Sequence, residues 1–251
     1  IVAASTIPPA LLLNVALPRE QATTTAAPTT TPAKAKKPSG SGSGGFARVF
    51  STPSVRWILL GATTRLFAGF AIGAWAAPYY RSAFPTRQSQ FALVNALIVA
   101  GGGTTAAVTG GVIADKLSAM EGGEANKGLL PLCGALIAIP FWLLAVRTLN
   151  FHLAMGSLLL AYLAAETWYG ATIAMMQGAL PRSVWGTAQG TLNLVQIVAN
   201  LSPLLLGSLV RRGVALRLLL SVTIPASYVA TALCFWRARV ERIREGPVKE
   251  D

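Results

Sequence analysis

The chain has 251 residues, of which 53% are hydrophobic and 12% charged, with a mean hydropathy of +0.54 and a formal net charge of +12. A soluble domain carries about 25% charged residues, so the low charge and the long apolar runs exclude an ordinary soluble domain and predict an all-α, multi-pass integral membrane protein. The basic residues lie mostly in loops and tails, where anionic lipid and topology explain them better than nucleic acid does. The predicted partner is therefore the lipid bilayer, and no nucleic acid is expected.

The first 50 residues are predicted to precede the main bundle. Residues 1–18 are apolar, lack a basic leader and end in Pro18-Arg19-Glu20, so we interpret them as the end of a preceding transmembrane helix in a longer protein. Residues 19–50 are rich in Thr, Ala, Pro, Lys, Ser and Gly. They are predicted to form a disordered basic linker, because they cannot bury enough apolar surface to become ordered. The end of this region, Phe46–Trp57, is expected to lead into the next helix as a short interfacial segment.

A six-helix transmembrane bundle is predicted over residues 51–236, followed by a basic cytoplasmic tail, 237–251. Each apolar run is long enough to cross a bilayer, which takes about 20 residues. Short connections make sequential helices antiparallel neighbours. The prolines inside the third, fifth and sixth spans are tolerated when neighbouring helices satisfy the freed carbonyls. The six spans are predicted at 57–80, 91–117, 129–146, 151–180, 187–210 and 216–236.

Lysine and arginine predict the orientation of the spans. The side that includes the linker and the C-terminal tail receives fourteen of these residues, and the opposite side receives six. An excess of Lys and Arg marks the cytoplasmic side. The linker and the C-terminus are therefore predicted to be cytoplasmic, as six spans between them require.

The fourth predicted span carries Glu166, the only one of nine acidic residues that lies well inside an apolar segment. A carboxylate at that depth is costly unless it is paired, protonated or facing water. The first span carries Arg65, which either snorkels to the cytoplasmic surface or meets Glu166 or an anionic substrate in a cavity. The two side chains can meet only if the first span starts nearer Ser51 than Trp57, or if the helices tilt. For Glu166 the alternative is a structural, hydrogen-bonded acid.

Further polar and aromatic residues are candidates for the same site. Asn193, Gln196 and Asn200 share one face of the fifth span, where amides line a polar pathway or join helices. Tyr162 and Tyr169 flank Glu166 along the fourth span, where aromatic residues serve as packing or as substrate contacts.

An intramembrane enzyme is not favoured. Such an enzyme needs a nucleophile with a base, or metal ligands, within the membrane. The chain has one histidine and no paired carboxylates within its apolar runs, and both cysteines lie in such runs. No catalytic residue, metal site or cofactor is therefore predicted.

Two short motifs resemble loops of the major facilitator superfamily. Gly111-Val112-Ile113-Ala114-Asp115-Lys116 ends the second span with a glycine, three apolar residues, an acid and a base, and Pro181-Arg182-Ser183 follows the fourth span. Both motifs stand at the span ends where that superfamily carries them in each six-helix half. Within the superfamily, Phe70–Pro78 and Ala165-Glu166, leading to Pro181-Arg182-Ser183, are most similar to spinster-like members.

The resemblance implies the C-terminal half of a twelve-span transporter, with a missing N-terminal half as partner and a small-molecule substrate bound between the halves. It implies secondary-active transport of a small or amphipathic organic solute by alternating access. The alternative is a non-transporting membrane scaffold or sensor built on the same fold. The resemblance assigns gating to Gly111, Asp115, Lys116 and Arg182. Substrate contact or proton coupling is expected of Glu166, Arg65, Asn193, Gln196, Asn200, Tyr162 and Tyr169.

Overall fold

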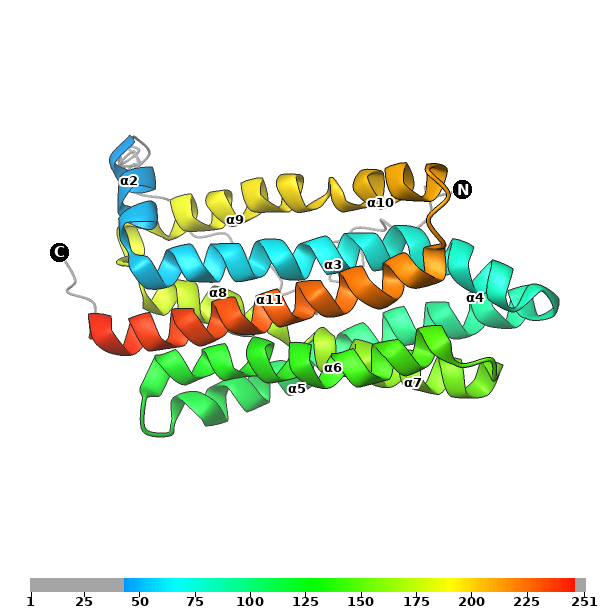
Figure 1. Ribbon diagram of the computed structural model, residues 1–251. Helices are drawn as coiled ribbons and strands as arrows, with labels where there is room; N and C mark the ends of the chain where they lie inside the picture. Colours follow the sequence, from blue (N-terminus) through cyan, green and yellow to red (C-terminus); the bar gives the residue numbers. More distant parts are fainter. Residues whose placement is uncertain (1–42, 247–251) are drawn as a thin grey trace, which may run out of the picture. The chain divides into compact units, whose positions relative to one another are not determined.

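The computed structural model describes residues 43–246, which lie within one compact unit, residues 38–251. The predictions for residues 1–18, for most of the linker and for the end of the tail fall outside the described residues. Within the described range every regular element is a helix, and no strand occurs there (Figure 1). The all-α prediction is confirmed for this part of the chain.

Six helical segments are long and apolar enough to cross a membrane, in the predicted order. They exceed the roughly 20 residues that a bilayer needs, and helices satisfy their backbone groups internally, as the hydrocarbon core requires. The six-span prediction is therefore confirmed. The six segments are Pro53–Ala83, Pro85–Ser118, Gly123–Arg147, Phe151–Gly178, Arg182–Arg211 and Leu216–Glu245.

Three spans are nearly continuous helices. Helix α3 (Pro53–Ala83) forms the first span, with a proline at its first helical position, where a missing N–H is not needed. Helix α6 (Leu129–Arg147) forms most of the third span after the short helix η3 (Gly123–Gly128). Helix α11 (Leu216–Glu245) forms the sixth span.

The other three spans are interrupted near their middles. The second span passes from α4 through a π-helical turn, η2, into α5. The fourth span is split into α7 and α8, and the fifth into α9 and α10. Pro203 stands in the first turn of α10 and accounts for the second of these breaks, since it cannot donate to the preceding turn. The bounds are α4 Gln88–Leu97, η2 Ile98–Gly102, α5 Gly103–Ser118, α7 Phe151–Ala165, α8 Trp168–Gly178, α9 Trp185–Ala199 and α10 Ser202–Arg211.

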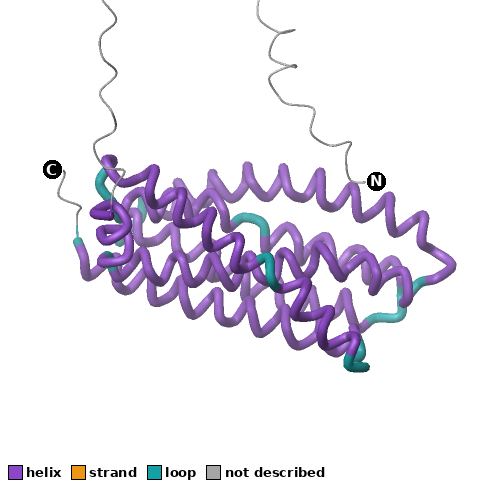
Figure 2. The backbone as a smooth tube through the Cα atoms, turned by 90° about the horizontal axis from the view of Figure 1, so that it is seen from above, coloured by secondary structure: helices purple, strands orange, loops and turns teal. Residues whose placement is uncertain are grey.

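Helices α3, α6, α7 and α11 form the centre of the bundle. Helix α11 lies along α3 and α6, and α6 also lies along α7 (Figure 1). Figure 2 shows the helices of the bundle side by side from above. The span made of α9 and α10 packs on α3 at the edge, and only 17% of its apolar window is buried, compared with 50% for α11. Two buried clusters divide α3 along its length: one includes Ile58 and Ala62, and the other begins at Ala68. Arg65 lies between them.

Two boundary predictions were wrong. Residues 237–245, predicted as tail, continue α11 as helix. The Glu245 carboxylate accepts hydrogen bonds from the Ser54 backbone N–H (2.8 Å) and hydroxyl (2.5 Å), and this caps the first turn of α3. The Arg242 guanidinium donates to the Gly178 carbonyl at 2.6 Å. These contacts hold the end of α11 against the bundle, where the sequence predicted that the span had ended and a basic cytoplasmic tail had begun.

The predicted linker also reached too far. Residues Ser43–Ser51 form helix α2, which contacts α3 and α9. Val49 is fully buried in the same cluster as Ile58, whereas Phe46 and Phe50 are exposed. Burial of Val49 among residues of the bundle therefore orders this short segment, while its two aromatic side chains remain exposed.

Candidate functional site

Arg65 and Glu166 lie at the same depth in the bundle. Arg65 follows the start of α3 by twelve residues, and Glu166 precedes the end of α8, at Gly178, by twelve residues. At a rise of about 1.5 Å per residue, each is about 18 Å from its helix end, close to the middle of a hydrocarbon core about 30 Å thick. The first span starts at Pro53 rather than Trp57, which meets the condition under which the two side chains were expected to reach each other.

The two residues form an ion pair. Arg65 Nη2 lies 2.7 Å from Glu166 Oε1, and the Arg65 side chain is 3% exposed while that of Glu166 is 30% exposed. The guanidinium lies between the rings of Trp168 and Tyr228, 5.5 Å from each ring centroid. Cation–π attraction and the ion pair together offset part of the cost of burying the charge. Arg65 is therefore held inside the bundle and does not snorkel to the surface.

The break in the fourth span is built into the same site. Ending α7 at Ala165 leaves the last carbonyls of the helix without backbone partners, which is costly inside a membrane. Arg65 Nε and Nη2 donate to the Ala165 carbonyl at 3.2 and 2.9 Å. The Thr167 hydroxyl donates to the Ala164 carbonyl at 3.1 Å. Arg65 thus donates hydrogen bonds both to the last carbonyl of α7 and to the Glu166 carboxylate.

Glycines let two neighbouring helices approach this break. A Cβ placed at Gly134 of α6 would lie 2.5 Å from the Ala164 carbonyl oxygen, and one at Gly110 of α5 would lie 2.9 Å from the Thr167 carbonyl oxygen. No side chain fits at either distance. Small residues at helix interfaces allow such close backbone contact, so α5 and α6 pack closely against the point where the fourth span is interrupted. Gly110 thus brings the second span into close backbone contact with the fourth.

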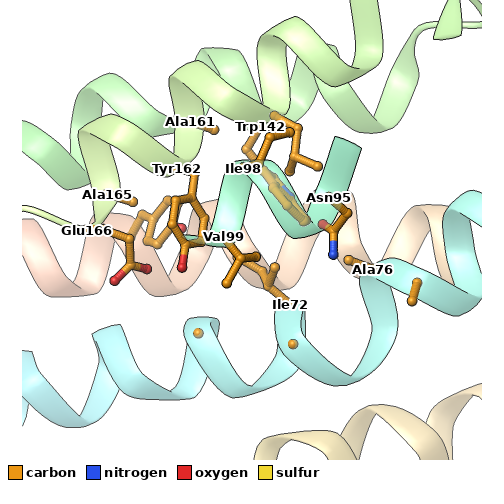
Figure 3. A pocket seen from close by; sticks show the side chains of 15 residues that line it. Ile72, Ala76, Asn95, Ile98, Val99, Trp142, Ala161, Tyr162, Ala165 and Glu166 are labelled. Atoms are coloured by element: carbon orange, nitrogen blue, oxygen red, sulfur yellow. The ribbon is translucent and has the colours of Figure 1, made fainter. Parts of the chain in front are cut away.

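Glu166 lies on the wall of a cavity of about 280 Å³. Five of the six spans contribute to its lining, and Figure 3 shows Glu166 and Tyr162 toward one end with Asn95 and Ala76 toward the other. The π-helical turn η2 contributes Ile98 and Val99; such turns occur frequently at functional sites. The full lining is Gly69, Ile72, Gly73, Ala76, Ala77, Asn95, Ile98, Val99, Trp142, Leu158, Ala161, Tyr162, Ala165, Glu166 and Tyr228.

Three polar or aromatic residues of this cavity were missed by the sequence reasoning. Asn95 is half-buried on the wall, and its position inside the apolar run of the second span was a usable signal, because a polar side chain at depth marks a functional site. Trp142 and Tyr228 are buried on the wall, 1% and 2% exposed. No signal in the sequence separates these two aromatic residues from ordinary core residues.

Several predicted site residues lie elsewhere. Tyr169 is 46% exposed and stacks edge-on against Trp168 outside the cavity. Asn193, Gln196 and Asn200 are exposed on α9 and do not line the cavity. Helix α9 packs on α3 through its other face, as shown by buried Leu192 and Ala199. The amide stripe is therefore real as a helix face, but this half of the structure does not bring it to the Glu166 site.

The residues predicted to act in gating lie near one end of the bundle and do not line the cavity. Gly111, Asp115 and Lys116 are exposed on the last turns of α5. Asp115 forms no ion pair with another described residue. Arg182 is exposed and stacks on Trp185 with 5.8 Å from its guanidinium carbon to the ring centroid. Among residues 43–246 there is also no group of three or more His, Cys, Asp or Glu side chains that could hold a metal ion.

Comparison with known proteins gives a structural match and no sequence match. No protein-family model matches the chain, and no curated protein matches it. A solved structure of a bacterial homologue of the human lysosomal transporter Spinster, in an inward-facing and unoccupied conformation, is similar with a TM-score of 0.57 and 18% sequence identity. The similarity covers 94% of this chain and 55% of that protein, so the chain spans about half the length of the transporter it matches. The chain therefore has the fold of one six-helix half of a major facilitator transporter.

Proposed function

We propose that this chain forms one half of a secondary-active membrane transporter for a small or amphipathic organic solute. In this proposal a second, N-terminal six-helix half completes the protein, and the two bundles rock about a central site. The observation that carries the proposal is the Arg65–Glu166 pair at mid-depth, on the wall of a cavity, at a break in a membrane-spanning helix. Ionisable residues in such positions mark substrate or ion pathways.

The arrangement suggests how a bound proton or solute changes the site. Glu166 lines the cavity, while Arg65, which does not line it, donates hydrogen bonds to the Glu166 carboxylate and to the Ala165 carbonyl. Protonation of Glu166, or binding of a solute to it, weakens its attraction for Arg65. The same guanidinium donates to the last carbonyl of α7. A change in the Arg65–Glu166 interaction therefore also affects the hydrogen bonds at the break in the fourth span. The site is thus suited to coupling occupancy to movement of α7 and α8.

The proposal is tested by Glu166→Gln in the full-length protein reconstituted into vesicles, with a panel of solutes and imposed pH gradients. A coupling role predicts loss of gradient-driven uptake with retention of solute exchange. A substrate-contact role predicts loss of both. The matched control is Glu241→Gln, since among residues 43–246 Glu241 forms its one ion pair with exposed Arg244, far along α11. If Glu166→Gln transports at the wild-type rate with the wild-type pH dependence, both roles are refuted. If the full-length wild-type protein transports no solute of the panel, the transporter proposal fails in favour of the non-transporting scaffold.

The orientation belongs to the same proposal. We place the end of α5 that carries Lys116, and the end of α11, on the cytoplasmic side, with Arg81 on the opposite side. Single cysteines at Lys116 and Arg81, introduced after both native cysteines are replaced, are expected to react with a membrane-impermeant reagent from opposite sides. Reaction of both from one side would refute the arrangement.

A further inference from the structure

The charge that faces the cavity is negative. Glu166 is the one charged residue among those that line it in the described part of the chain. Arg65 does not belong to the lining and is 3% exposed behind the wall. Arg65 uses Nε and Nη2 to donate to the Ala165 carbonyl and to Glu166, so the carboxylate of this pair, and not the guanidinium, is the charged group among the residues that line the cavity.

The carboxylate keeps one oxygen for an incoming donor. Glu166 Oε1 accepts from Arg65 at 2.7 Å, whereas Oε2 accepts no hydrogen bond from any residue in the range 43–246. With 30% of its side chain exposed, Glu166 can accept a further donor on Oε2 while its bond to Arg65 stays in place. A carboxylate has room for such a second partner.

Aromatic rings also line the cavity. Tyr162 stands beside Glu166, whereas Trp142 lies farther along the cavity, toward Asn95 (Figure 3). Tyr228 lines the cavity as well, and its ring centroid lies 5.5 Å from the guanidinium carbon of Arg65. The Trp142 indole N–H already donates to the Leu220 carbonyl at 3.0 Å, so Trp142 offers the cavity its ring and not a donor. Aromatic faces attract cations and are the usual partners of ammonium groups.

The opposite wall suits an apolar body. Helix α3 contributes Gly69, Gly73 and Ala76 there, which leave space along the helix, and the cavity ends near Asn95 (Figure 3). A volume of about 280 Å³ is just below the range of ligand pockets, which begins at about 300 Å³. The space therefore fits a small organic ion or the head of an amphiphile.

We propose that the cavity binds an organic cation, with its ammonium group between Glu166 Oε2 and the aromatic rings and its apolar part along α3. This inference rests on the proposed function, since it names the class of solute for the same site. It assigns Glu166 as the attractive charge and Arg65 as the residue that positions it.

The test measures binding to the purified full-length protein with two probes of equal chain length, hexyltrimethylammonium and hexanesulfonate. Binding is followed by calorimetry, with the melting temperature as a check on folding. The wild-type protein is expected to bind the ammonium probe and not the sulfonate. Equal binding of both, preference for the sulfonate, or no binding of the ammonium probe by folded protein would overturn the inference.

A charge series at Asn95 gives a second reading that does not disturb the ion pair. Asn95→Asp adds a negative charge to the wall and is expected to tighten ammonium binding about tenfold, while Asn95→Lys weakens it by at least about the same factor. The opposite order, or no change across the series, would contradict the assignment of the cavity as the binding site.

The two proposals can fail separately. If the ammonium probe binds with the Asn95 dependence but no vesicle assay shows movement of any solute, the transporter proposal fails and the solute class stands. If the protein transports a solute while preferring the sulfonate probe, the solute class fails and the transporter proposal stands.

Discussion

The ion pair between Arg65 and Glu166 gives the sharpest prediction for stability. In Glu166→Gln a buried guanidinium loses its counter-charge, and removing one partner of a buried pair costs about 3–5 kcal/mol. The amide oxygen of glutamine can still accept from Arg65, and the Glu166 side chain is 30% exposed rather than buried. We therefore expect the lower end of the range, about 3 kcal/mol in the free energy of unfolding.

The second arm of the cycle is Arg65→Met, which replaces the cation by an apolar side chain of similar length. It leaves the Ala165 carbonyl without its two donors, and an unsatisfied buried acceptor costs about 1–3 kcal/mol. It also removes contacts with the Trp168 and Tyr228 rings. The double variant contains no unpaired buried charge, so it should cost no more than Arg65→Met alone. The expected coupling energy is thus about 3 kcal/mol, at the upper end for residues in contact.

The assay is reversible unfolding of the full-length protein in mixed micelles, titrated with SDS and followed by tryptophan fluorescence and by circular dichroism. All four proteins of the cycle are measured under one set of conditions. If the two single effects add to within about 0.5 kcal/mol, which is the range for independent sites, then the two charges do not depend on each other and the reasoning about the pair is refuted.

Three further predictions concern the surrounding structure. Gly134→Ala is expected to destabilise the protein by about 1–3 kcal/mol, because its methyl group would overlap a backbone oxygen of the fourth span. Gly156→Ala, with no atom within 4 Å of its added methyl group, should be neutral or stabilising in the same unfolding assay. Equal effects of the two variants would refute the close packing of α6 on the fourth span. Glu245→Ala removes the cap of α3 and is expected to lower the free energy of unfolding by about 1–2 kcal/mol. Glu241→Ala breaks the ion pair with Arg244 and should lower it by less than about 1 kcal/mol. The reverse order of the two effects would refute the capping contact. Asp115→Asn should reduce transport by the reconstituted full-length protein without lowering its melting temperature, and an unchanged rate would remove Asp115 from the gate.

The number, order and approximate extent of the spans could be predicted from the sequence, because the length of an apolar run is a local property and a bilayer accepts only runs of about 20 residues or more. The same local reasoning placed Glu166 within the membrane, since a single acid stands out in an apolar run. It also set the condition under which Arg65 would reach Glu166, because depth along a helix follows from residue count.

Local reasoning was weakest at the ends and breaks of helices. The sequence predicted a tail from residue 237, but three contacts from residues more than sixty positions away in the chain keep α11 helical to Glu245. No proline or glycine stands at the break after Ala165, so the sequence carries no local signal for it. It persists because Arg65 of another span satisfies the freed carbonyl and because glycines on α5 and α6 leave room for it.

Which side chains share the cavity was decided only by the tertiary structure. Asn95, Trp142 and Tyr228 come from three different spans and line the same cavity as Glu166 through the rotation and crossing of their helices. Within a bilayer those angles are set by close packing of small residues and not by hydrophobicity, which is nearly the same on every face. For that reason the sequence could assign the amides of the fifth span to one helix face but not to a site. It also could not predict which member of the Arg65–Glu166 pair lines the cavity; the tertiary structure places Glu166 on the cavity wall and leaves Arg65 out of the lining.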